Sequence, residues 1–276
     1  DQICESLNWM GCRWDEDLKF QSQRDELYER KLQVLLESGN AYRCFCDKEV
    51  LANIRSEREK AGMGYSYPGK CRSLNNNDIK VKLESNVPNV IRIKIPEGTT
   101  KFSDSIYGDI SVNNDELDDF IVARTDGSPT YNFTVVADDN DMDITHVIRG
   151  EDHISNTPKQ IILYEALGYD IPQFAHLPMI LGEDKKRLSK RHGATGVQEF
   201  RDKGFLNSAL VNYLALLGWN PGTEQELFSL EELTRKFSID RVHKKGAVWD
   251  NQKLEWINQQ TILRMENDDI LVQILN

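Results

Sequence analysis

The sequence predicts an α/β fold with a parallel sheet in its second half. Two short apolar segments, residues 120–123 and 144–148, have the composition of buried strands, and a third apolar segment follows at residues 177–181. Between the last two segments, Thr157 is expected to cap a helix whose first position is Pro158. Strand, helix and strand in this order are typical of a βαβ unit, in which the two strands run parallel.

The remaining segments differ in amino-acid composition and in predicted secondary structure. The first forty residues are expected to be helical, with apolar side chains on one face between residues 27 and 36 and Gly39 at the helix end. Residues 42–118 are richer in Asn, Gly, Pro and charge and contain a strand-like alternation at residues 90–96, which predicts an inserted α+β unit. Further helices are expected at residues 206–217, 230–237 and 254–265.

Size and composition indicate a globular protein. The length of 276 residues allows about two domains. Hydrophobic residues make up 39 % and charged residues 29 %, which excludes general disorder. No apolar run approaches the roughly 20 residues of a membrane span, and the first five residues have no signal-peptide features. Five cysteines are too few for a disulfide scaffold, so we expect a cytoplasmic protein with no membrane partner.

Positive charge gathers in one short segment of an acidic chain. The net charge of −11, from 34 Lys and Arg against 45 Asp and Glu, excludes a globally basic nucleic-acid coat. Residues 185–191 nevertheless contain five Lys or Arg, and charges this close repel unless an anion or solvent compensates. We interpret the segment as a loop closing over a polyphosphate, with Lys190 as a point charge and Arg187 and Arg191 as forked donors. The alternative is a solvated basic turn.

A second polar group follows the predicted strand at residues 144–148. Arg149, Asp152 and His153 come directly after this strand. Ligands of parallel sheets bind at the carboxyl ends of strands, and an arginine there can pair with a carboxylate through two donors. The alternative is an ordinary surface cluster of ion pairs.

Three further features are expected to be structural. The turn and aromatic alternation at residues 129–133 are more typical of strand packing than of a pocket. The acidic residues 138–143 lack the central Gly and final Glu of a calcium loop, which favours a polar turn. His176 stands alone in an apolar segment and is expected to be a satisfied structural residue.

Three motifs, in this order and spacing, resemble those of one enzyme family. They are DGSPTYNF at residues 126–133, HVIRGEDH at 146–153 and RLSKRHG at 187–193. Together they resemble the bacterial-type glutamyl-tRNA synthetases of class I, over nearly the whole chain. The resemblance implies a ligase that activates L-glutamate with ATP and magnesium as glutamyl-adenylate. The glutamyl group then passes to the terminal adenosine of tRNA(Glu) in protein synthesis.

The resemblance also implies roles for individual residues. Residues 187–191 match the family's KMSKS-type loop, whose lysine, here Lys190, contacts the ATP phosphates in the transition state. Arg187 stands where the family most often has Lys, which keeps the charge but changes the donor geometry. The implied residues are Lys190, Arg187 and Ser189 for catalysis, Tyr131 and Arg149 for glutamate, and Asp152, His153 and Lys190 for ATP.

Three cysteines have a spacing that suits a metal. Cys44 and Cys46 form a close pair, and Cys71 follows with Tyr67 four residues before it. Zinc prefers thiolates in tetrahedral closure, and the alternative is two buried thiols and an unrelated third. The cysteines match a zinc-bearing insertion of some relatives, in which a further His ligand occupies the position of Ser73 here. Tyr67 and water are both candidates for the fourth ligand, and the resemblance, with Ser73 in place of the His, implies zinc with Tyr67 as the better candidate.

The implied architecture is the second half of a Rossmann-like class I catalytic domain, with an α+β acceptor-binding insertion and a helical stem-contact domain. The expected parts are residues 1–41 as the end of the first Rossmann half, 42–118 as the acceptor-end-binding insertion, 119–184 as the second half, and 185–276 as the KMSKS-type loop and stem-contact domain. None of the five His forms the HIGH-type motif that the family places upstream. We therefore expect an internal piece of a longer, monomeric synthetase, inactive as residues 1–276 alone.

Two other functions stay open at this point. One is the truncated paralogue that glutamylates queuosine in tRNA(Asp), which shares the catalytic core and the Cys/Tyr zinc pattern. Residues 200–260 resemble a stem-contact domain, which argues against it. The other is a non-catalytic, zinc-stapled tRNA-binding module. The missing first Rossmann strand supports this module, whereas the retained Tyr131, Arg149 and Lys190 count against it.

Overall fold

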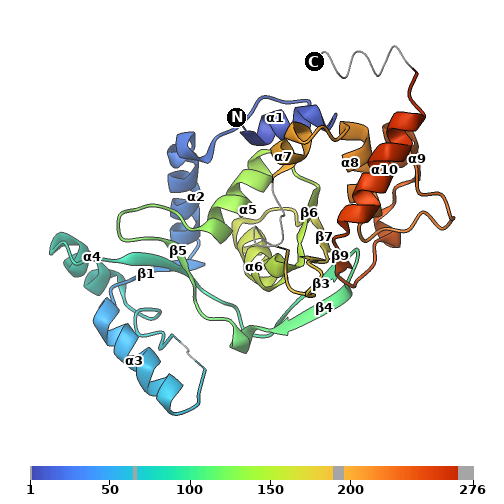
Figure 1. Cartoon of the computed structure of the whole chain (residues 1–276). Helices are drawn as coiled ribbons and strands as arrows, with labels where there is room; N and C mark the ends of the chain where they lie inside the picture. Colours follow the sequence, from blue (N-terminus) through green and yellow to red (C-terminus); the bar gives the residue numbers. More distant parts are fainter. Residues whose placement is uncertain (1, 65–66, 189–195, 267–276) are drawn as a thin grey trace.

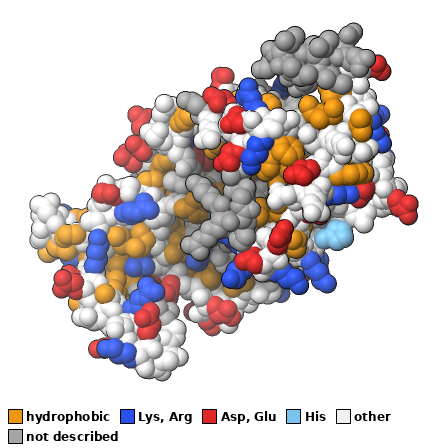
Figure 2. All heavy atoms as spheres, in the orientation of Figure 1, with side chains coloured by type: hydrophobic (Ala, Val, Ile, Leu, Met, Phe, Trp, Pro, Cys, Tyr) orange, Lys and Arg blue, Asp and Glu red, His pale blue; other side chains and the backbone are white. Residues whose placement is uncertain are grey.

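The structure is a computed structural model that describes residues 2–64, 67–188 and 196–266. The described strands form a three-stranded, a four-stranded and a two-stranded sheet, with helices packed around them (Figure 1). Acidic and basic side chains are interspersed over the face shown in Figure 2. Within the described ranges, no helix is both long enough and apolar enough to cross a bilayer.

The N-terminal part contains one strongly buried helix. Its elements are α1 (Gln2–Trp9), the 3-10 helix η1 (Gln21–Gln23) and α2 (Asp25–Glu37). α2 buries Tyr28, Leu32 and Leu35, and Gly39 follows it at φ 75°, as the sequence periodicity predicts. The expectation of helix throughout the first forty residues is wrong for residues 12–20, which form no helix. No apolar stripe repeats at helical spacing in that segment.

The chain after α2 builds an antiparallel sheet. Its strands and the two helices between the first and second strand are β1 (Ala41–Cys44), α3 (Lys48–Lys60), α4 (Asn76–Glu84), β2 (Val90–Ile93) and β5 (Ile121–Ala123). β2 is the central strand and pairs with both β1 and β5. The strand predicted at residues 90–96 is confirmed, although it ends at Ile93, before Pro96.

The larger sheet carries the predicted parallel unit. Its strands, in spatial order, are β4 (Gly108–Asn113), β3 (Thr99–Asp104), β7 (Gln173–Leu177) and β6 (His146–Gly150). β6 and β7 run parallel and are joined through α6 (Thr157–Leu167), which confirms the βαβ order. The second strand of the unit was predicted at residues 177–181, and this location is wrong, because β7 ends at Leu177. β3 pairs in parallel with β7 as well, so residues 42–118 contribute strands to both larger sheets. The division of the chain into four parts stays a prediction.

Several local predictions in this region are wrong. α6 begins at Thr157 with Asn156 in the N-cap position, so Thr157 is not the cap, although Pro158 does lie in the first turn. Residues 129–133 lead into α5 (Tyr131–Asp141) and form no strand. The acidic segment 138–143 likewise begins inside α5. The strand predicted at residues 144–148 exists but is not buried: Ile148 is 52 % exposed, since β6 lies at the edge of its sheet.

One hydrophobic core joins the two larger sheets to α2, α5 and α6. Its fully buried side chains include Leu35, Ile93, Val122, Phe133 and Phe174. Burial of a side chain of this size contributes roughly 1.5–3 kcal/mol. The core therefore fixes the ends of β6 and β7 relative to α5 and α6.

Helices dominate the C-terminal part, as predicted. They are α7 (Val197–Asp202), α8 (Asn207–Leu216), α9 (Leu230–Lys236) and α10 (Asn251–Leu263), with the 3-10 helix η5 (Ile239–Arg241). Two further 3-10 helices, η2 (Asn114–Glu116) and η3 (Glu151–Asn156), lie earlier in the described chain. α8 buries Ala209, Leu210 and Tyr213 in a core that α10 shares. β8 (Ile180–Leu181) pairs in parallel with β9 (Ala247–Val248), which ties these helices to the segment after β7.

Candidate active site

Polar side chains gather at the carboxyl ends of β6 and β7. Arg149 lies near the end of β6, η3 follows it and carries Asp152 and His153, and Tyr131 begins α5. The hydroxyl of Tyr131 lies 3.4 Å from Nδ1 of His153, and the two ring centroids are 5.8 Å apart. The structure thus brings together residues that the sequence analysis named, at the edge where parallel sheets bind ligands.

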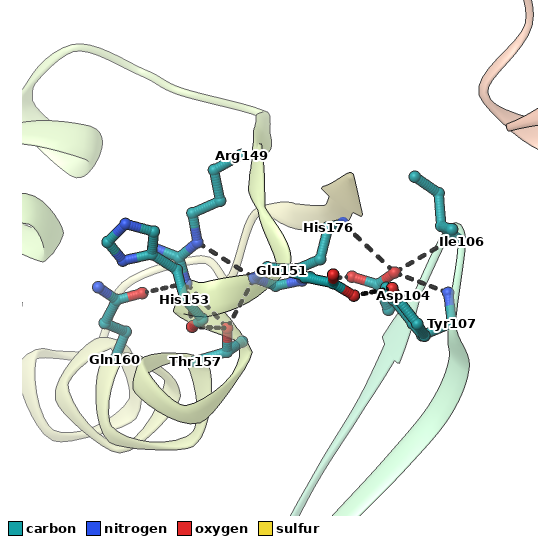
Figure 3. A network of polar contacts seen from close by, with 9 residues as sticks. All are labelled: Asp104, Ile106, Tyr107, Arg149, Glu151, His153, Thr157, Gln160 and His176. Carbon is teal, nitrogen blue, oxygen red and sulfur yellow. Dashed lines mark hydrogen bonds and ion pairs between the residues drawn. The ribbon is translucent and has the colours of Figure 1, made fainter. Parts of the chain in front are cut away.

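Arg149 is held on one side by neutral acceptors. Its Nη2 donates to Oγ1 of Thr157 and to Oε1 of Gln160, both at 2.8 Å, and its Nε donates to Nε2 of His176 at 3.1 Å (Figure 3). Burial lowers the pKa of Arg149, while the charge of Asp139 acts in the opposite direction. Within the described ranges no carboxylate forms an ion pair with Arg149, and the phenol of Tyr131 interacts with its guanidinium. The guanidinium therefore keeps its charge for a ligand.

His176 and Asp104 form a buried pair behind Arg149. Both side chains are 0 % exposed, and Nδ1 of His176 lies 2.6 Å from Oδ2 of Asp104. Burial lowers the pKa of His176, and Asp104 offsets this only in part. Burial raises the pKa of Asp104, but hydrogen bonds from the backbone N–H of Tyr107 and from His176 lower it overall. At neutral pH the pair is therefore a carboxylate and a neutral imidazole.

A cavity of about 670 Å³ opens beside Arg149. Its polar wall contains Arg149, Asp152, His153 and Arg187, and its apolar wall includes Leu177, Met179, Leu214 and Trp219. Nη1 of Arg187 lies 3.2 Å from Oδ2 of Asp152. A cavity with one apolar wall and two arginines suits a nucleotide, whose base needs apolar contact and whose phosphates need positive charge. Ser189, Lys190 and Arg191 lie outside the described residues.

The three expected zinc ligands and Tyr67 converge on one point. The thiol sulfurs of Cys44, Cys46 and Cys71 lie within 4.8 Å of one another. The Tyr67 hydroxyl lies 3.0 Å from Sγ of Cys44 and 3.6 Å from Sγ of Cys46. Tetrahedral zinc with Zn–S bonds of about 2.3 Å separates its sulfurs by about 3.8 Å, and Cys46 and Cys71 are 3.7 Å apart. Three thiols and one phenol oxygen therefore fit a closed zinc site.

Comparison with known protein families identifies the family and the fold. A sequence model of the tRNA synthetases class I (E and Q), catalytic domain, matches residues 1–256. The chain belongs to this family. The resemblance seen in the three sequence motifs is thereby confirmed, and membership of this class I family accounts for the parallel strands β3, β7 and β6 around the polar site.

Individual relatives of the synthetase chain agree with this result. Over 99 % of its length, the chain is 50 % identical to glutamate–tRNA ligase 1 of Caldanaerobacter subterraneus subsp. tengcongensis. Over 99 % of its length, it is also 49 % identical to glutamate–tRNA ligase of Aquifex aeolicus. The crystal structure of a glutamate tRNA ligase from Elizabethkingia meningosepticum in complex with its amino acid matches 98 % of the chain with a TM-score of 0.89 at 36 % identity. This match confirms the Rossmann-like α/β fold.

The synthetase chain spans 57 % and 58 % of the two ligases and 61 % of the crystallised chain. It therefore represents little more than half of each of these three relatives.

Sequence reasoning missed the residues that hold Arg149 in place. Thr157 was expected to cap a helix, His176 to be merely structural, and Asp104 and Gln160 were not singled out. The one signal available was a histidine inside an apolar strand, because a buried imidazole needs polar partners on both nitrogens. The partners of His176 are Asp104 on β3, Arg149 on β6 and Thr157 on α6, which lie 19 to 72 residues away in sequence.

Proposed function

We propose that the protein is a glutamate–tRNA ligase, which joins L-glutamate to the 3′ end of tRNA(Glu) through glutamyl-adenylate. The observation that carries the proposal is Arg149, a cation with no ion pair in the described chain, at the wall of a nucleotide-sized cavity. Recognition of a side-chain carboxylate by a fixed guanidinium would explain why the substrate is an acidic amino acid. Relatives near 50 % identity are named glutamate–tRNA ligases, which supports the same reaction.

In the proposed mechanism, the cavity holds ATP next to the amino acid. A carboxylate oxygen of glutamate attacks the α-phosphorus of ATP, and pyrophosphate leaves. Arg149 and Tyr131 hold glutamate, and Asp152 and His153 contact ATP. Arg187, Ser189 and Lys190 stabilise the charge that develops on the phosphate oxygens. Magnesium, when bound with ATP, would supply further positive charge to these oxygens. A ribose hydroxyl of the terminal adenosine of tRNA(Glu) then attacks the glutamyl carbonyl, and AMP leaves.

The same proposal assigns parts to the rest of the chain. Cys44, Cys46, Cys71 and Tyr67 would hold zinc, which cross-links the segment between β1 and β2 and takes no part in the chemistry. The four divisions at residues 1–41, 42–118, 119–184 and 185–276 keep their proposed roles, with the helical part contacting tRNA phosphates. The protein is proposed to act as a monomer in the cytoplasm.

The decisive test is tRNA-dependent ATP–pyrophosphate exchange with glutamate. The full-length gene product should catalyse exchange with tRNA(Glu), and Lys190→Ala should lower it by orders of magnitude, because the lysine acts on the transition state. Lys31→Ala is the matched control, since Lys31 lies over the ring of Tyr169 and outside the cavity. Its exchange rate should equal that of the wild type.

Other outcomes would favour the remaining functions. Exchange with tRNA(Asp) and none with tRNA(Glu) would favour the queuosine-modifying paralogue. Tight tRNA binding without binding of glutamate or ATP would favour the zinc-stapled binding module. Both results contradict the proposed ligase.

A further inference from the structure

Hydrogen bonds orient the guanidinium of Arg149 without pairing it with a carboxylate. Thr157, Gln160 and His176 accept its hydrogen bonds, and all three are uncharged at neutral pH (Figure 3). A carboxylate in any of these places would fix the guanidinium and cancel its charge at the same time. Among these acceptors, His176 differs from the others because its acceptor capacity depends on its protonation state.

Asp104 decides which nitrogen of His176 carries the proton. Oδ1 of Asp104 accepts from the backbone N–H of Ile106 at 3.0 Å and of Tyr107 at 2.9 Å, while Oδ2 faces Nδ1 of His176 at 2.6 Å. A carboxylate only accepts hydrogen bonds, so Nδ1 is the donor. In a neutral imidazole the other nitrogen, Nε2, is then the acceptor that Nε–H of Arg149 requires.

We propose that Asp104 and His176 are positioning residues that orient Arg149 toward the carboxylate of glutamate. This inference rests on the proposed function, which gives Arg149 its ligand. The ionisable groups around His176 are Asp104 from β3, Arg149 from β6 and His153 from η3. Protonation of His176 would place an N–H on Nε2, which could then no longer accept the hydrogen bond from Nε of Arg149. It would also place a second positive charge beside the guanidinium. Glutamate affinity should therefore fall when His176 gains a proton.

Asp104→Asn tests the proton position directly. The amide retains an oxygen for Ile106 and Tyr107 but presents an NH₂ group to Nδ1 of His176. The imidazole proton then moves to Nε2, where it faces Nε–H of Arg149. In tRNA-dependent exchange by the full-length gene product, the KM for glutamate should rise about 10- to 100-fold, as for loss of a hydrogen bond to a charged group. The KM for ATP should stay close to the wild-type value.

Two substitutions of His176 separate the acceptor from the ring. His176→Phe fills the same space without an acceptor and should raise the glutamate KM as much as Asp104→Asn does. His176→Gln brings an amide oxygen near the position of Nε2, so its glutamate KM should lie well below that of the Phe variant. The wild-type glutamate KM should rise as the pH falls from 7 to about 5, and His176→Gln should lack this rise.

Thr100→Val is the matched control for lost stability. Thr100 is buried on β3, as Asp104 is, and its hydroxyl donates to Oδ1 of Asn114 at 2.7 Å. The control removes a buried hydrogen bond from the same strand without reaching Arg149, and its glutamate KM should be unchanged.

Specific results would overturn the inference. They are an unchanged glutamate KM in folded Asp104→Asn and His176→Phe, or equal rises of the KM for glutamate and for ATP. If Asp104→Asn fails to fold, the pH profiles of the wild type and His176→Gln decide: matching profiles reject the positioning role. A wild-type protein without exchange contradicts the proposed function instead.

Discussion

The hydroxyl of Tyr67 lies 3.0 Å from the sulfur of Cys44, so a phenol oxygen shares a pocket with three thiols. The guanidinium carbon of Arg92 lies 3.9 Å above the centre of the same tyrosine ring, which fixes the ring on its other side. Tyr67 is thus oriented by a cation on its face and presents its oxygen to the cysteines.

The proposed zinc site predicts a specific effect of Tyr67→Phe. The purified protein should contain about one zinc per chain, and Tyr67→Phe should weaken zinc binding at least ~10-fold, because it removes a ligand oxygen but keeps the ring beneath Arg92. Metal content by mass spectrometry and competition with a chelator measure both quantities. Cys12→Ser removes an exposed free thiol outside this cluster and should leave zinc binding unchanged. Protein without zinc after preparation free of chelators would contradict the site.

The packing of α2 in the core predicts that two neighbouring substitutions on this helix differ in their effect on the free energy of unfolding. Leu35 is 0 % exposed and Val34 is 44 % exposed on the same helix. Leu35→Ala should lower the free energy of unfolding by about 2–5 kcal/mol, through lost burial and the cavity that remains. Val34→Ala should change it by less than about 1 kcal/mol. Urea unfolding of the two variants provides the measurement, and equal losses would contradict the placement of α2.

The buried pair of Asp104 and His176 predicts that the protein loses stability below neutral pH. The pKa of His176 is lowered from 6.5 in the folded state, so the unfolded chain binds the proton more readily. Its contribution to stability is therefore lost as the pH falls below about 6.5. The lowered pKa of Asp104 adds a second loss in more acidic solution, as this carboxylate is protonated. Urea unfolding at pH 7 and 5 should show a smaller decline for His176→Gln than for the wild type.

The pair of Asp152 and Arg187 predicts a variant that affects ligand binding but not stability. The two side chains are 33 % and 68 % exposed, and an exposed ion pair contributes at most about 1 kcal/mol. Asp152→Asn should leave the unfolding midpoint nearly unchanged but raise the KM for ATP about 10-fold. Asp141→Asn, which alters an ion pair with Arg24 outside the cavity, should leave that KM unchanged. A large loss of stability in Asp152→Asn would indicate a structural role instead.

The proposed contact with tRNA predicts salt-dependent binding by an acidic protein. Lys245 is exposed near β9, where it is available to a phosphate. The affinity for tRNA(Glu) should fall with rising salt, and Lys245→Ala should reduce the slope of log affinity against log salt by about 1. Filter binding at several salt concentrations measures the slope, and Lys31→Ala should reproduce the wild-type line. If Lys245→Ala leaves the slope of log affinity against log salt unchanged, Lys245 does not contact a tRNA phosphate.

Much of this protein could be predicted from the sequence because local patterns determine it. Periodic apolar residues identify α2, α8 and α10, and the segments flanking Pro158 identify the βαβ unit. Three motifs identified the family, because they match its motifs in residue type, order and spacing. The cysteine spacing identified the metal-like cluster before its geometry was known.

Other features depended on contacts between distant segments. Residues 129–133 begin a helix although their alternation is typical of a strand, since the packing of Phe133 in the core decides the outcome. β6 is exposed because of its place in the strand order, which its own composition does not determine. The network of Asp104, His176 and Arg149 exists only where β3, β7 and β6 lie side by side. The sequence by itself determined which residues could do chemistry. Only the tertiary structure decided which of them meet, because hydrogen bonds act over about 3 Å and not along the chain.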